Sequence, residues 1–224
     1  MQNQPDPITW RDGDVPVSSL FDDPFFSLED GVAETRHVFL EGNDLPARFR
    51  PGFQIAELGF GTGLNLLMAW DAWVRSGQKG ALRFTSFEAY PMAPADMARA
   101  HQAFPAFDGR RDALGAAWNG LGGQIALPGL TAEIIVGDAR DTLPRWENEA
   151  DAWFLDGFSP AKNPELRSED LMAEVGAQTA AGGTAATYAA AGFVRRGLQN
   201  AGFDVERAAG FGRKRHMTRA RRLP

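Results

Sequence analysis

Glu57-Leu58-Gly59-Phe60-Gly61-Thr62-Gly63 is the stretch that decides the fold of this chain. It closes a short apolar run that begins at Phe53, which is typical of a buried strand, and it precedes apolar residues at helical spacing from Leu64 to Ala72. Three glycines in five residues allow a tight turn and a close approach of a ligand to the main chain. The stretch therefore predicts a strand, a ligand-binding turn and a helix in succession.

The glycine spacing and the acid before it narrow the choice of ligand. A dinucleotide-binding turn reads G-x-G-x-x-G, with its third glycine one place beyond Gly63. The Glu57 carboxylate would repel a pyrophosphate, but it would not repel a ligand that carries a sulfonium and an amino group. The turn favours S-adenosylmethionine over NAD, and a purely structural turn is the alternative.

Alternating strands and helices extend outward from this turn. We expect strands at 53–58, 83–87, 131–136, 152–155, 184–188, 203–207 and 216–221, and helices at 64–72, 91–103, 168–179 and 193–200, with 105–130 unassigned. This alternation predicts an α/β fold with a doubly wound, mostly parallel sheet. Residues 1–52 read as an irregular extension, with one hairpin that includes Arg36–Leu40, packed on a core of residues 53–224 in a single globular domain.

Composition excludes several classes of protein. The chain has no cysteine, which excludes disulfides, thiolate zinc sites and cysteine nucleophiles, and its three histidines lack metal spacing, so no metal is expected. No apolar run approaches the roughly 18–20 residues of a membrane span, and the first residues do not resemble a signal peptide. We expect a cytoplasmic protein without a membrane partner.

Charge is unevenly distributed along the chain. The net charge is −6, yet residues 1–60 hold 11 acids against 4 bases, whereas residues 207–222 hold 7 bases and no acid. A basic strip on an acidic body could bind a polyanion at one place only, and a solvated tail is the alternative.

Acidic residues follow three predicted strands. Ligands bind beyond the carboxyl ends of strands in such sheets, so these acids are candidates for a site. Glu88 is placed to accept hydrogen bonds from both ribose hydroxyls of a nucleoside. Asp138 would accept one from the adenine amino group, or would instead cap a short helix at Ala139. Asp156 suits an amine nucleophile, because a carboxylate orients an ammonium and helps to remove its proton; a loop-stabilising role is the alternative.

Several blocks of the sequence resemble the methyltransferase half of the bifunctional MnmC enzymes, which make 5-methylaminomethyl-2-thiouridine at the wobble position of bacterial tRNA. The blocks are residues 34–43, 57–65, 151–164, 191–198 and 210–215, and the resemblance runs from about residue 14 to 222. It implies a class I, Rossmann-like methyltransferase fold and conversion of an aminomethyl group on the wobble uridine to methylaminomethyl.

The resemblance also implies roles for individual residues. S-adenosylmethionine would lie on Gly59, Gly61 and Gly63, with Glu57, Phe60 and Asn65 beside it, with Glu88 and Asp138 on its nucleoside, and with Asp156 at both cofactor and substrate amine. The candidate tRNA contacts are Phe158, Lys162, Arg195, Arg196, Arg213, Lys214 and Arg215.

Two positions depart from the family, which often has Tyr where this chain has His37 and an aromatic residue near the position of Arg167. The FAD-dependent oxidase half is absent here, so we expect methylation only. Two alternatives remain open, a small-molecule N- or O-methyltransferase and a noncatalytic binding module. Whether the basic strip borders the cofactor cleft would discriminate between a tRNA and a small-molecule substrate.

Overall fold

A twisted eight-stranded sheet forms the centre of the molecule. The structure, a computed structural model, describes residues 7–11, 14–27 and 29–223. The strand order is β10-β11-β9-β8-β4-β5-β7-β6. Its members are β4 (Gln54–Leu58), β5 (Leu82–Glu88), β6 (Gly123–Leu127), β7 (Leu130–Val136), β8 (Ala150–Leu155), β9 (Thr179–Thr187), β10 (Phe203–Ala209) and β11 (His216–Arg222).

Pairing within this sheet is parallel at its centre and antiparallel at its edges. Strands β7, β5, β4, β8 and β9 pair in parallel, while β6 on one side and β11 and β10 on the other pair antiparallel. The central strands β4 and β8 are buried along their whole length, as expected when helices cover both faces of a sheet. The predicted α/β fold with a mostly parallel, doubly wound sheet is confirmed.

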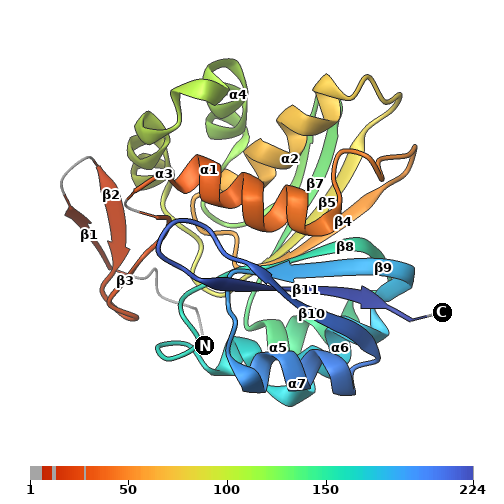
Figure 1. Cartoon of the computed structure of the whole chain (residues 1–224). Helices are drawn as coiled ribbons and strands as arrows, with labels where there is room; N and C mark the ends of the chain where they lie inside the picture. Colours follow the sequence, from red (N-terminus) through yellow and green to blue (C-terminus); the bar gives the residue numbers. More distant parts are fainter. Residues whose placement is uncertain (1–6, 12–13, 28, 224) are drawn as a thin grey trace.

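Helices lie in two layers, one on each face of the sheet (Figure 1). One layer holds α1 (Gly31–Thr35), η1 (Arg36–Leu40), η2 (Glu41–Asn43), α2 (Leu64–Arg75), α3 (Pro94–Ala100), η3 (His101–Ala103), η4 (Pro105–Phe107) and α4 (Asp108–Ala117). The other holds α5 (Ala139–Thr142), η5 (Leu143–Arg145), η6 (Glu165–Arg167), α6 (Glu169–Ala177) and α7 (Gly192–Asn200). Each layer buries its own cluster of apolar side chains against the sheet.

The prediction of a hairpin through Arg36–Leu40 is wrong. These residues continue helix α1 as a turn of π-helix, and α1, η1 and η2 form one rod over the sheet (Figure 1). Val38, Phe39 and Leu40 are buried, and the Phe39 ring stacks on Phe154 of β8 at 5.3 Å. A run of four residues such as His37–Leu40 does not distinguish strand from helix by periodicity, and packing against the sheet selects the helix.

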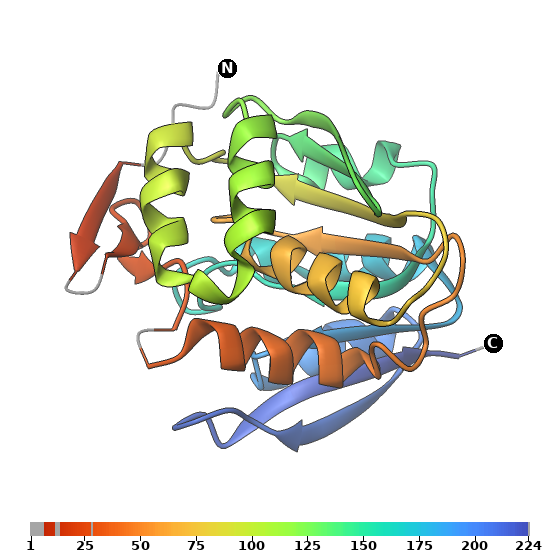
Figure 2. The same ribbon diagram turned by 90° about the horizontal axis from the view of Figure 1, so that it is seen from above.

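A small antiparallel sheet lies further toward the N-terminus. It contains β1 (Ile8–Arg11), β2 (Val15–Ser18) and β3 (Asp23–Pro24). It sits beside the ends toward which the parallel strands run, next to α3 (Figures 1 and 2). Segments near both β3 and α1 thus reach the edge of the main sheet where a ligand is expected.

The other predicted elements occur within a few residues of their expected bounds, except β9, which starts at Thr179 rather than 184. The unassigned stretch 105–130 contains η4, α4 and β6. Residues 38–49 share one apolar cluster with β4 and α2, and the division of the chain at residue 52 stays a prediction. Within the described residues, none of the helices combines the length and the apolar character needed to cross a bilayer.

Candidate active site

The glycine turn brings β4 against the loop that follows β8. Gly59, Gly61 and Gly63 have φ values of +86°, +53° and +74°, which side-chain-bearing residues rarely adopt. A Cβ on Gly59 would lie 3.0 Å from the Cα of Gly157. Glycine is therefore needed at residue 59 both for the backbone angle and for the contact between the two loops.

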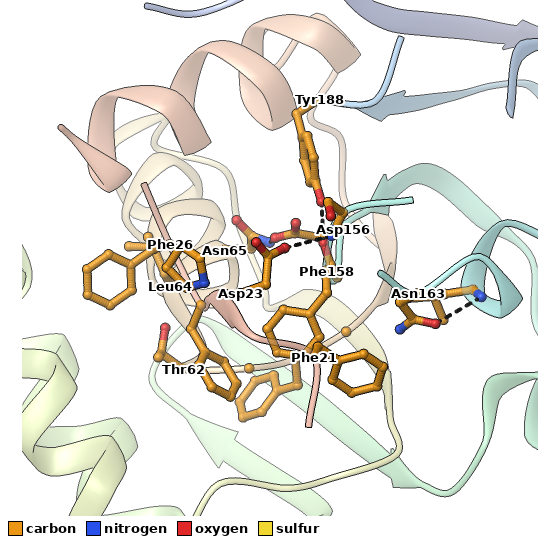
Figure 3. A pocket seen from close by; sticks show the side chains of 18 of the residues that line it. Phe21, Asp23, Phe26, Thr62, Leu64, Asn65, Asp156, Phe158, Asn163 and Tyr188 are labelled. Atoms are coloured by element: carbon orange, nitrogen blue, oxygen red, sulfur yellow. Dashed lines mark hydrogen bonds between the residues drawn. The ribbon is translucent and has the colours of Figure 1, made fainter. Parts of the chain in front are cut away.

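A cavity of about 810 Å³ opens at this turn. Its wall comes from the ends of β4, β5 and β8, from residues within 20–27 and 29–39, and from the loop before β11. Figure 3 shows Asp156, Phe158 and Tyr188 among the side chains that line it. The predicted site residues that line it are Gly59, Phe60, Gly61, Asn65, Glu88, Asp138, Asp156, Phe158, Lys162, Arg213 and Lys214. The lining does not include Glu57, Gly63, Arg195, Arg196 or Arg215.

One amide at the cavity wall joins the buried Glu57 to the partly buried Asp156. The Asn65 Nδ2 donates to Glu57 Oε1 at 2.8 Å and to Asp156 Oδ2 at 2.7 Å, and the Ser86 hydroxyl donates to Glu57 Oε2 at 2.6 Å. Glu57 is completely buried, and this burial raises its pKa well above the ordinary value, against the effect of the two hydrogen bonds. Glu57 thus acts on the cavity through Asn65.

Asp156 stands at the end of β8, where its side chain meets the cavity (Figure 3). Burial raises the pKa of Asp156 to about 6, with the Asn65 hydrogen bond and the charge of Arg167 opposing the rise. A carboxyl group that titrates near 6 can release and accept a proton close to neutral pH.

The two residues predicted to bind the nucleoside, Glu88 and Asp138, form hydrogen bonds within the protein. Glu88 accepts hydrogen bonds from the main-chain N–H groups of Gly61 at 2.9 Å and Tyr90 at 2.7 Å, so it holds the glycine turn to the end of β5. Asp138 caps α5 by accepting from the Arg140 N–H at 2.9 Å, and it also pairs with the Arg140 guanidinium at 2.6 Å. Arg140 accordingly lowers the pKa of Asp138. The alternative interpretation of Asp138 as a helix cap is therefore confirmed. The roles of Glu88 at the ribose and of Asp138 at the adenine stay predictions.

Aromatic side chains form one wall of the cavity. The Phe158 ring stacks on Phe21 at 4.7 Å and meets Phe25 edge-on at 5.1 Å. The N–H of Ser159 donates to Asp23 at 2.8 Å, and Lys162 pairs with Asp22. Sequence reasoning missed Phe21 and the tether at Asp23, since they lie some 135 residues from the loop they cover and no local spacing indicates them.

The basic strip has two parts with different surroundings. At the cavity, Lys214 lies 2.6 Å from Glu34 and 4.3 Å above the ring of Tyr188, and the exposed Arg213 pairs with Glu29 at 2.9 Å. Further along β11, Arg219 and Arg221 pair with Asp44 at 2.6 and 3.0 Å. The strip therefore borders the cavity at one end only, and much of its charge meets acids from the N-terminal region.

The residues of the cavity fit a cationic ligand held against main chain. Within the described residues, neither Glu57 nor Asp156 forms an ion pair. Burial raises the pKa of both, and at Asp156 the charges of Arg167 and Lys214 oppose the rise only in part, so a further positive charge would be favourable there. A sulfonium with an ammonium group would supply it, and the glycine turn leaves the main chain accessible. The described part of the chain holds no group of three His, Cys, Asp or Glu residues able to bind a metal.

Comparisons with known proteins agree with this geometry. Residues 118–222 match the family described as S-adenosyl-L-methionine-dependent methyltransferase. Two bifunctional MnmC proteins for tRNA 5-methylaminomethyl-2-thiouridine biosynthesis are similar to the chain. That of Caulobacter sp. (strain K31) is 45% identical over 96% of the chain, and that of Hahella chejuensis is 46% identical over 94%. The crystal structure of MnmC2 from Aquifex aeolicus superposes with a TM-score of 0.78 at 25% identity, covering 100% of this chain and 72% of that one.

The chain belongs to the MnmC-type S-adenosyl-L-methionine-dependent methyltransferases. Its fold is the class I methyltransferase fold, and its cofactor is S-adenosylmethionine. This methyltransferase spans 38% and 36% of the lengths of the two bifunctional relatives.

Proposed function

We propose that the chain methylates the amino nitrogen of 5-aminomethyl-(2-thio)uridine at the tRNA wobble position, giving 5-methylaminomethyl-(2-thio)uridine. The observation that carries this proposal is Asp156, a partly buried carboxyl group that lines the cavity at the end of β8 and whose pKa is raised by desolvation to about 6. The printed names of the bifunctional relatives, which refer to tRNA 5-methylaminomethyl-2-thiouridine biosynthesis, support the substrate. Such a function would place the protein in the cytoplasm with its tRNA.

The chemistry asks little of the protein beyond position and proton control. S-adenosylmethionine supplies the methyl group from its sulfonium. The substrate amine attacks only when it is uncharged, so an ammonium must first lose one proton. The Asp156 carboxylate is proposed to orient that ammonium and to accept the proton, while Asn65 fixes one of its oxygens at 2.7 Å.

The cofactor is proposed to lie along the glycine turn. The main chain of residues 59–63 would contact the cofactor. Asn65, which donates a hydrogen bond to Glu57, would lie beside it. Glu88 would face the ribose, and Asp138 would face the adenine. These assignments rest on the matched motifs and on the cavity lining, which includes every one of these residues except Glu57 and Gly63.

The tRNA is proposed to approach from the side of the loop before β11. Arg213 and Lys214 line the cavity there and the exposed Arg215 follows them, while Phe158 and Lys162 lie on the loop after Asp156. Arg195 and Arg196, on α7 outside the cavity lining, would belong to the outer part of the same contact. Phosphate contacts from these cations would make tRNA affinity fall steeply as salt rises.

A methyl-transfer assay tests the substrate directly. Purified protein, labelled S-adenosylmethionine and tRNA carrying aminomethyl-modified wobble uridine are expected to give labelled methylaminomethyl nucleoside after digestion of the tRNA. The same tRNA lacking the aminomethyl group is the control and should stay unlabelled. Absence of transfer to the modified tRNA, with transfer to a small amine instead, would overturn the proposal.

A second candidate is a small-molecule N- or O-methyltransferase that uses the same cofactor site. The observation in its favour is the pairing of the basic strip, because Arg213, Lys214 and Arg219 each meet an acid and offer less charge to a phosphate backbone. Its substrates would show little dependence of KM on salt, whereas KM for tRNA should rise with salt.

A further inference from the structure

Arg167 is a buried cation directly behind the Asp156 loop. The residue, last in η6, is 1% exposed. Its Nη2 donates to the carbonyl oxygens of Leu155 at 3.0 Å and Asp156 at 2.6 Å, and its Nη1 donates to that of Leu166 at 3.0 Å. One guanidinium thus joins the end of β8 to the segment that returns toward α6.

In the part of the chain that the structure describes, no acidic side chain pairs directly with the buried Arg167 guanidinium. Among the described residues, Arg167 forms no ion pair, and its Nε is buried without a hydrogen-bond partner. Burying a guanidinium is unfavourable unless other groups compensate its charge, and burial lowers the pKa of Arg167 accordingly. The charge that favours the Arg167 cation near neutral pH is that of Asp156, because burial raises the pKa of the adjacent Tyr188 phenol and keeps it uncharged there. The field of Arg167 therefore acts mainly on the proposed catalytic carboxylate.

We propose that Arg167 is a positioning residue for Asp156, because its guanidinium fixes the main chain from which the carboxylate projects and places a positive charge behind it. This inference rests on the role of Asp156 in the proposed function. It assigns a task to one of the two positions at which the chain departs from the family it resembles.

The charged and polar groups around Asp156 come from every neighbouring element. They are Glu57 on β4, Asn65 on α2, Arg167 on η6, Tyr188 after β9, and Lys214 before β11. Lys214 lies 2.6 Å from Glu34, so the Glu34 carboxylate offsets part of the effect of the Lys214 charge on Asp156. Arg167 has no such partner in the described structure, and its effect in lowering the pKa of Asp156 is larger than that of Lys214.

The test compares kcat/KM as a function of pH for wild type and Arg167→Met, using aminomethyl-modified tRNA. Removing the cation is expected to move the acid limb to higher pH, with kcat/KM about tenfold lower at pH 6 and within about twofold of wild type at pH 9. Arg167→Trp fills the site with an aromatic ring of the kind often found near this position in the family, and it should give the same shift. Arg167→Lys keeps a cation and should leave the limb near its wild-type position.

Two outcomes would overturn the inference. A loss of the same factor at every pH in the Met and Trp variants would show a merely structural role, and an Arg167→Lys profile displaced as far as that of Arg167→Met would exclude an effect of charge. The control is Arg111→Met on α4, because Arg111 also has a buried Nε without a hydrogen-bond partner and donates to the carbonyl of His101. Its pH profile should match wild type.

A titration without substrate separates this inference from the proposed function. The carboxyl carbon of Asp156, assigned by its absence in Asp156→Asn, is followed by NMR against pH in wild type and Arg167→Met. An upward shift of its midpoint supports the inference even if Asp156→Asn still methylates tRNA, which would instead refute the role given to Asp156. An unchanged midpoint refutes the inference even if Asp156 proves essential.

Discussion

Strand β8 has an aspartate at each end, and the two have opposite surroundings. Near its start, Asp151 accepts from Arg50 at 2.7 Å through one oxygen and from the Gln54 N–H at 2.9 Å through the other. Past its end, Asp156 accepts one side-chain hydrogen bond, from Asn65, and faces the cavity.

Asp151 and Asp156 differ in the groups that compensate the charge of each carboxylate. Asp151 has a cation and a main-chain donor, and the adjacent Arg48 donates to the carbonyl of Asp151 as well, so the polar groups there satisfy one another. The charge of Asp156 is poorly compensated, and its pKa rises to about 6. A buried acid with its hydrogen bonds completed stabilises the fold, whereas one left short of them is available to a ligand or a proton.

The largest expected effect comes from neutralising each aspartate in turn, which tests whether the two have different roles. Asp156→Asn should lower the methyl-transfer rate about 10²–10⁴-fold, because the group that orients and deprotonates the amine is lost. Its affinity for S-adenosylmethionine, measured by calorimetry, should fall far less than the methyl-transfer rate. Asp151→Asn should lower the free energy of unfolding by about 1–3 kcal/mol with unchanged turnover per folded molecule. Equal turnover of wild type and Asp156→Asn would contradict the assignment.

The next effect concerns the glycine that touches the Asp156 loop. Gly59→Ala places a Cβ 3.0 Å from the Gly157 Cα at a φ of +86° and should weaken cofactor binding about tenfold. Gly77→Ala is the matched control, because Gly77 has a φ of +71° but no atom lies within 4 Å of the place its Cβ would take. It should lose stability through backbone strain while cofactor affinity stays as in wild type. A similar fall in affinity for both variants would exclude the loop contact as the cause.

A smaller effect follows from the pKa of Asp156. Since the ionised form is the one that accepts a proton, the rate should fall to half its plateau at a pH of about 6 and decline further below it. Stability should change in the opposite sense. The folded-state pKa is raised above 3.8, so the protonated carboxyl favours folding, and this contribution is lost as pH rises from about 4 through about 6. Denaturation of wild type against Asp156→Asn over this range measures it, and a constant difference would contradict the raised pKa.

The smallest predicted effect lies in the aromatic wall. Phe21→Ala removes a ring stacked on Phe158 at 4.7 Å, an interaction of about 0.5–1.5 kcal/mol, and should raise the KM for the methyl acceptor by about two- to tenfold. Trp10→Ala removes a ring from β1 of the same small sheet, but Trp10 is not among the residues that line the cavity, so the KM of this variant should stay unchanged. A rise of KM in both variants would point to the small sheet as a whole.

Sequence reasoning reached the parts of the site that depend on strand ends. Glu88, Asp138 and Asp156 were predicted because each follows a recognisable strand, and the structure brings all three to one cavity. It did not reach Phe21 or Tyr188, which arrive from distant segments whose own residues show no functional pattern.

Local sequence patterns do not predict the structure where tertiary packing determines the secondary structure or the direction of a side chain. The apolar residues Val38–Leu40 are too few to distinguish strand from helix, and their burial, with Phe39 stacked on Phe154, accompanies a helix. Glu57 is predicted beside the ligand, and this stays a prediction; its side chain is not among the cavity lining and accepts a hydrogen bond from Asn65, which is.

The position of β11 has a consequence for synthesis of the protein. It is inserted between β9 and β10, although it follows both in the chain. Until residues 216–222 have left the ribosome, β9 has no partner on that side, and its row of N–H and C=O groups is open to strands of other nascent chains. β10 cannot close this edge by itself, because its place in the sheet is one strand further out. Folding of this half therefore waits for the last strand, and slow translation of residues 203–222 would lengthen the time at risk of aggregation.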